Sequence, residues 1–237
     1  LQPLNAKNAK NVLEDFKDDD NLWVGTSYKT RSFFTKEKAR YSAQDSAISY
    51  ENLFNNNSND TILVRSINNK YNQALVANIL YRYGENRTKI MINNLVKNFA
   101  RKPQGGDTDQ LKSLYYGIGD FAIANSYYYL RLLNSNNTEE KNIAEKLKMI
   151  NPQIDNYGTS INISGVGIVK HSKNKDAANL FIDYLLSEKA QKFFNDNNFE
   201  YSIFNIQNIL DYDVKALKHL YLYADEAFDI AVDAGWK

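Results

Sequence analysis

The chain has 237 residues, of which 43% are hydrophobic and 24% are charged, and its formal net charge is +1. Its Lys and Arg residues are scattered, which argues against a phosphate-binding surface, and no apolar run is long enough to span a membrane. The absence of cysteine excludes disulfides and cysteine-based metal sites. We therefore expect small ligands or proteins as partners, with no nucleic acid and no direct membrane insertion.

The first third of the chain predicts an extended segment, a short helix, a buried strand and a longer helix. Residues 22–34 are typical of one extended segment, and residues 46–54 of an amphipathic helix that ends in asparagines. The short apolar run 61–64 lies between polar residues, which indicates a buried strand. From Tyr71 the apolar residues take helical spacing, and Gly84 is a natural place for that helix to stop.

The middle of the chain begins with a second helix, which the pattern predicts over residues 87–99. The Pro-Gln-Gly-Gly sequence at 103–106 is typical of a loop. Asp107 or Thr108 is then expected to cap a helix that ends at Gly117.

The remainder predicts two strands, an amphipathic helix and a helical tail. Residues 121–124 form an apolar strand, and residues 158–170 a longer one. Apolar residues recur with helical spacing over 177–185, and a helical tail is expected over 213–234. Because strands alternate with helices, the sequence predicts an α/β fold with a largely parallel sheet.

The junction after the strand 121–124 carries the most distinctive chemistry of the chain. Asn125 and a possible helix cap, Ser126, are followed by three tyrosines that open an apolar helix. The positive end of a helix favours a phenolate, so we expect it to lower the pKa of a tyrosine here from about 10. Phenolates of Tyr127 and Tyr128 that converge beyond the helix end would suit a hard cation such as Fe³⁺, and binding would release their protons.

The alternative is that the three tyrosines pack the helix start against the sheet, which is the commoner role of an aromatic run. Tyr129 is expected in the core under either interpretation. Both histidines, His171 and His219, are expected in surface or core-edge positions. The sequence contains no arrangement typical of a serine hydrolase, a zinc protease or a phosphate-binding loop, so we expect no enzyme activity.

Five segments resemble the ferric-iron-binding periplasmic proteins of bacterial ABC importers. They are residues 23–27, 65–77, 101–110, 119–129 and 162–171, in the order in which the family has them. The resemblance extends over essentially the whole chain. It implies an α/β, two-lobe periplasmic-binding-protein fold (the Venus-flytrap, type II arrangement) with crossing hinge strands.

The resemblance also implies a set of ligands. The first two tyrosines of the family's Asn-Ser/Thr-Tyr-Tyr motif bind iron and correspond to Tyr127 and Tyr128. The tyrosine-rich subgroup takes a third tyrosine from a Tyr-Asn-Gln motif, here Tyr71, and depends little on a synergistic anion. If an anion such as carbonate is bound, Asn125 and Arg31 are the expected contacts.

The family implies a division into lobes. Residues 1–33 and 157–208 would belong to the first lobe, residues 34–156 to the second, and residues 209–237 would form a helical segment on the second. Family members begin with a segment that bears a further His or Tyr ligand and precedes the residues seen here. We therefore expect an incomplete first lobe, weaker iron binding and self-association through an exposed sheet edge.

The function implied is capture of ferric iron between the lobes and delivery to an inner-membrane ABC permease, in the periplasm of a Gram-negative bacterium and after loss of a signal peptide that this chain does not contain. Three alternatives remain open at this point. One is a related binding protein for a polyamine, thiamine or an organic anion. The others are an enzyme on the same two-lobe fold and a surface interaction protein.

Overall fold

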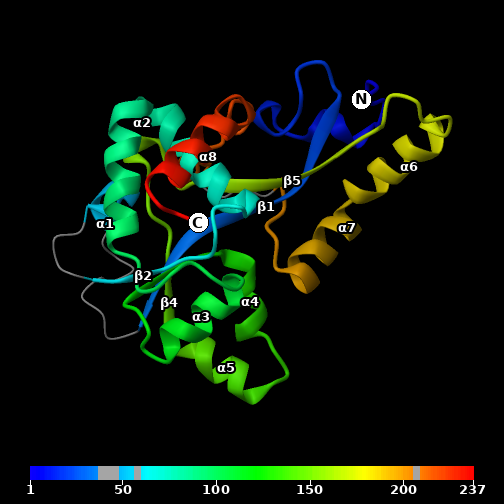
Figure 1. The fold of residues 1–237 in the computed structure, drawn as a ribbon. Coiled ribbons are helices and arrows are strands. Elements are labelled where there is room, and N and C mark those ends of the chain that lie inside the picture. The colour runs from blue at the N-terminus through cyan, green and yellow to red at the C-terminus, as the bar shows by residue number, and fades with distance from the viewer. Residues whose placement is uncertain (37–47, 56–59, 205–208) are drawn as a thin grey trace.

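The computed structural model describes residues 1–36, 48–55, 60–204 and 209–237. Its central element is the long strand β1 (Trp23–Lys36), which is buried along almost its whole length. The first part of β1 pairs with β5 (Ile161–Gly167), from Trp23 opposite Gly167 to Thr30 opposite Ile161. From Arg31 onward, β1 pairs instead with β3 (Phe121–Asn125) and β4 (Leu147–Ile150). One strand therefore belongs to two different sheet regions (Figure 1).

The sheet is mostly antiparallel, and the expectation of a largely parallel sheet is wrong. All three partners of β1 run against it, and only the short strand β2 (Ile62–Leu63) is parallel to its neighbour, β3. Parallel pairing requires a crossover connection, which here is supplied by the helices between β2 and β3. The alternation of strands and helices could not indicate that one strand would serve three antiparallel partners.

The strands β2, β3, β1 and β4, in that order, form what we call the four-strand region. Helices cover both of its faces: α2 and α8 lie on one side and α3, α4 and α5 on the other (Figure 1). Successive residues of a strand point to opposite faces, so Phe33 enters one core and Phe34 the other. The helices of this region are α1 (Tyr50–Phe54), α2 (Lys70–Lys97), α3 (Asp107–Tyr115), α4 (Ser126–Leu133), α5 (Thr138–Glu145) and α8 (Ala224–Asp233).

The first part of β1 and β5 form what we call the two-strand region, which has a single smaller core around Phe16, Val24, Tyr28 and Ile161. Its first residues are held by a backbone pairing between Gln2 and Ile168. Its helices are α6 (Lys175–Leu185) and α7 (Glu188–Phe193), which lie at one edge of the molecule (Figure 1). Short turns complete both regions: Asn8–Asn11, Glu14–Phe16, Asp155–Tyr157, Phe194–Asn198, Ile209–Asp211 and Leu220–Tyr223.

The predicted amphipathic helix over 177–185 forms as α6, but its apolar residues do not all face the core. Leu180, Phe181 and Tyr184 are 71%, 58% and 52% exposed, whereas Ile182 is 1% exposed. The helix therefore contacts the two-strand core through a narrow stripe and presents its wider apolar face to solvent.

The other predicted elements agree with the structure in type. The glycine predicted to stop a helix interrupts α2, where Gly84 has a positive φ of 74° between two helical halves. Of the helix predicted over 46–54, residues 50–54 form α1, while residues 46 and 47 lie outside the described part of the chain. The tail becomes helical only from residue 220, not 213. No helix among the described residues is both long and apolar enough to cross a membrane.

Candidate metal centre

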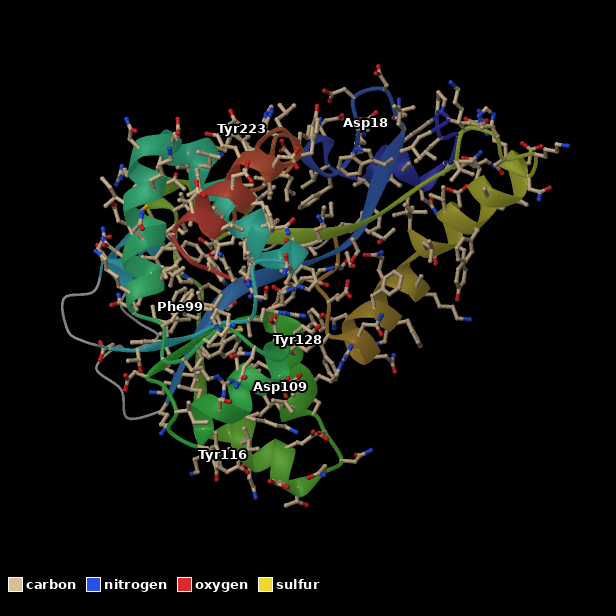
Figure 2. The ribbon with its side chains drawn as sticks, viewed as in Figure 1. Asp18, Phe99, Asp109, Tyr116, Tyr128 and Tyr223 are labelled. Carbon is tan, nitrogen blue, oxygen red and sulfur yellow. The ribbon has the colours of Figure 1, made fainter. Side chains whose placement is uncertain are left out.

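Helix α4 starts directly at the end of β3, which places its first turn at the boundary between the two regions. Its N-cap is Asn125 and not Ser126, which is already the first helical residue. The Ser126 hydroxyl accepts a hydrogen bond of 3.2 Å from the backbone N–H of Thr30 on β1. Tyr127 and Tyr128 follow in the first turn, and Tyr128 lies near the centre of the molecule (Figure 2).

The structure brings the three predicted tyrosine ligands together. The rings of Tyr127 and Tyr128 lie 4.1 Å apart between centroids. The Tyr127 phenol lies close enough to those of Tyr128 and Tyr71 for both to affect its pKa. Tyr71 comes from the first turn of α2, where Asn69 caps the helix by accepting from the Tyr71 N–H at 3.1 Å. Two helix starts that are distant in sequence therefore present their phenols to one another.

The expected lowering of a tyrosine pKa at the helix start is wrong for Tyr127. Burial is the main cause that raises the pKa of Tyr127, and interactions with the neighbouring phenols of Tyr128 and Tyr71 raise it further. Ionisation of Tyr127 would create a negative charge in a buried position beside two further phenols. The free-energy cost of this buried charge outweighs the stabilisation by the helix dipole. This phenol is therefore protonated at neutral pH unless a cation exchanges with its proton.

Two basic side chains lie beside the phenols. The Lys29 Nζ is 6.0 Å from the centroid of the Tyr71 ring, and the Arg131 Cζ is 5.3 Å from that of Tyr127. Lys29 is buried and donates to the Ser164 hydroxyl at 2.5 Å, with Glu200 3.6 Å away. Burial lowers the pKa of Lys29, and the opposing effect of Glu200 is smaller. Lys29 was not predicted from the sequence. Because it lies two residues before Arg31 on one strand, the two side chains are expected on the same face of the sheet, and this spacing could have indicated Lys29 as well.

Arg31, the other expected anion contact, lies in a buried polar network next to Asn125. Its side chain is fully buried, and its guanidinium donates to Asp107 at 2.6 Å, Asn125 at 3.2 Å and Asn72 at 2.5 Å. The Nε of the same guanidinium has no hydrogen-bond partner among the described residues. Asn125 is also buried, but its Nδ2 has no hydrogen-bond partner among the described residues and remains available as a donor.

The third tyrosine of the run lies in the core, as expected. The ring of Tyr129 packs 5.3 Å from that of Phe34, and its hydroxyl is 3.4 Å from the carbonyl oxygen of Leu147. His171 is exposed and His219 stacks on Tyr81, so neither lies at the tyrosine cluster. In the described part of the chain, no group of three His, Cys, Asp or Glu side chains could hold a metal ion. The candidate site therefore depends on phenol oxygens, which suit a hard trivalent cation once deprotonated.

Fold and site together define the class of this protein. The chain belongs to the family of bacterial extracellular solute-binding proteins, which it matches over residues 1–219. The structure confirms the type II periplasmic-binding-protein fold, because it superposes closely on solved ferric-binding proteins.

Particular relatives point to iron. The chain is 37% identical over 206 residues to iron uptake protein A2 of Synechocystis sp., an alignment that covers 86% of this chain and 59% of that protein. It matches the structure of Trichodesmium IdiA (FutA) in complex with iron and citrate with a TM-score of 0.90 and 33% identity, over 100% of this chain and 78% of that one. For the ferric binding protein from Campylobacter jejuni, the TM-score is 0.90, the identity is 28% and the coverage is the same. The chain thus spans less than two thirds of the curated relative.

Proposed function

We propose that this chain captures ferric iron for a bacterial ABC importer, with Tyr71, Tyr127 and Tyr128 as the protein ligands, and delivers it to an inner-membrane permease. The observation that carries the proposal is the convergence of these three phenols from two helix starts. The names of the relatives, an iron uptake protein and ferric-binding proteins, support the same cargo. The location that fits is the periplasm of a Gram-negative bacterium.

We infer that capture uses two lobes that close on the iron. Residues 1–33 and 157–208 would form one lobe and residues 34–156 the other, with residues 209–237 attached to the second. Two observations support this division: β1 changes partners after Thr30, and α8 packs into the same core as α2. Strands that run through both lobes can serve as a hinge, so that bound iron favours the closed state through contacts from both sides.

A small oxyanion such as carbonate would complete the iron shell beside the tyrosines. Asn125 supports this part of the proposal, since its unpartnered Nδ2 lies at the start of α4. The relative that was solved with iron and citrate holds an oxygen-rich anion together with its metal. The Arg31 Nε, which also has no hydrogen-bond partner among the described residues, is a second candidate contact for the anion.

The test is whether the chain takes ferric iron from a weak chelate through these phenols. Metal-free protein mixed with ferric nitrilotriacetate is expected to become coloured by charge transfer from tyrosinate to iron. The Tyr127→Phe, Tyr128→Phe double variant should lose that colour, because it lacks two of the three phenolates. Tyr129→Phe is the matched control, since this neighbouring tyrosine lies in the core. A colourless wild-type protein, or a double variant with unchanged iron affinity, would contradict the proposal.

A further inference from the structure

We propose that the buried ion pair between Arg31 and Asp107 fixes the relative position of the two helix starts that carry the tyrosine ligands. Arg31 and Asp107 are then positioning residues for iron binding. The inference rests on the proposed function and deepens it. It assigns a role to the largest fully buried charged side chain of the described residues, whose guanidinium donates to Asp107, Asn125 and Asn72.

Arg31 connects the two helices that carry the tyrosines. One terminal nitrogen of its guanidinium donates to Asn72 at 2.5 Å, and Asn72 is the residue after Tyr71 on α2. The other donates at 3.2 Å to Asn125, which occupies the N-cap position of α4 two residues before Tyr127. The distance between Tyr71 and Tyr127 thus depends on a single planar group that reaches both helix starts.

Asp107 fixes the same junction from a third helix. Its Oδ2 accepts from Arg31 at 2.6 Å and from the backbone N–H of Asn125 at 2.8 Å. Asp107 is the first residue of α3 and is fully buried. Asn72 in turn donates to the carbonyl oxygens of Arg65 and Ser66, which ties α2 to the segment before it. The starts of α2, α3 and α4 are therefore linked through one network.

The network is not arranged for stability alone. Two of its buried nitrogens, Arg31 Nε and Asn125 Nδ2, have no hydrogen-bond partner among the described residues, and Asp107 Oδ1 has only an ion-pair contact of 3.6 Å with Arg65. A buried polar network that is only partly satisfied is a poor source of stability, because each unpaired group keeps its desolvation cost. Its contacts with Asn72 and Asn125, which lie next to Tyr71 and close to Tyr127 in the sequence, give a reason for such an arrangement.

Simultaneous hydrogen bonds to Asn72 and Asn125 require a planar group with two terminal donors, which the guanidinium of Arg31 provides. Arginine can donate in two directions from a rigid group, whereas the lysine ammonium is a point charge on a flexible stem. Arg31→Lys should keep a charge paired with Asp107 but lose the simultaneous contacts with Asn72 and Asn125. Groups that orient metal ligands from behind typically change metal affinity by about 10- to 100-fold when replaced.

Arg31→Lys in the full chain is the first experiment, with competition against nitrilotriacetate as the measure of ferric affinity. We expect affinity to fall about 10- to 100-fold and the charge-transfer band to shift, because the phenolates no longer meet the iron in the same geometry. Arg82→Lys is the matched control. Arg82 makes a two-pronged pair with the buried carboxylate of Asp213 but lies about 16 Å along α2 from Tyr71. It should lose stability and leave affinity and band position unchanged.

Asn72→Ala is a second variant that leaves the Arg31–Asp107 pair intact, for the case in which Arg31→Lys does not fold. Asn78→Ala, a buried asparagine on the same helix outside the network, is its control. Asn72→Ala should weaken iron binding in the wild-type background but not in a Tyr71→Phe background, because it acts by placing Tyr71.

Additive effects of Asn72→Ala and Tyr71→Phe, or affinity and absorption in Arg31→Lys that match the wild type, would overturn the positioning role. The proposed function fails separately, when the wild-type protein itself stays colourless with ferric nitrilotriacetate.

Discussion

The two-strand and four-strand regions share strand β1, but they differ in how far helices cover the sheet and in how many hydrophobic cores they contain. Around residues 31–36 of β1, helices cover both faces of the sheet and two cores form. Around residues 23–30 there is one smaller core, and the apolar face of α6 remains exposed. An amphipathic pattern therefore predicts that a helix has an apolar face, but whether other elements cover that face depends on the tertiary structure.

The largest expected effect tests this contrast with one substitution in each region. Phe33→Ala removes a fully buried ring that contacts Tyr50, Phe54 and Phe121, and should lower the free energy of unfolding by about 3–5 kcal/mol. Phe181→Ala removes an exposed ring and should change it by about 0.5 kcal/mol or less. Urea denaturation measures both values. Equal losses would mean that the α6 face is covered in solution, and the comparison of the regions would fail.

The next effect concerns two buried tyrosines, one from each region. Burial raises the pKa of Tyr28 in the two-strand core as it does that of Tyr127 at the site. A raised pKa means that the phenol carries its proton at neutral pH, so ferric iron must displace it and affinity must rise with pH. The slope should be about tenfold per pH unit for each phenol proton displaced.

Proton release on iron loading, measured in weakly buffered solution, checks this slope directly. Tyr28→Phe is the control, because its proton lies in a core away from the site and should not be exchanged. Iron affinity that is independent of pH between 6 and 8 would show that phenol protons are not displaced.

The smallest expected change in the free energy of unfolding comes from two helix caps, and it tests whether the two regions unfold together. Asn137 caps α5 in the four-strand region, and Ser187 caps α7 in the two-strand region, each through its side-chain oxygen. Replacing either cap by Ala should cost about 1 kcal/mol. Because both regions share β1, we expect each variant to shift one common unfolding transition, monitored by circular dichroism. Separate transitions, each sensitive to only one cap, would show that the regions unfold independently.

The sequence predicted much of the local structure and singled out the tyrosines that the structure brings together at the candidate site. The sequence pattern predicted the helix interrupted at Gly84, the strand that leads to Asn125 and the helix that begins with the tyrosines. Such elements are predictable because periodicity and turn residues act over short distances along the chain. The family resemblance added Tyr71, which no local pattern could connect with Tyr127. The polar helix α5 and strand β4 were not predicted, because neither has a strong apolar period.

What the sequence by itself determined is thus the type and order of most elements, and the presence of adjacent tyrosines at a helix start. Only the tertiary structure decided the direction of the strands, the raised pKa of Tyr127 and the burial of Arg31 against Asp107. The physical reason is the same in each case. Strand pairing, desolvation and ion pairing depend on groups that are distant along the chain, and these groups meet only when β1 passes through both regions.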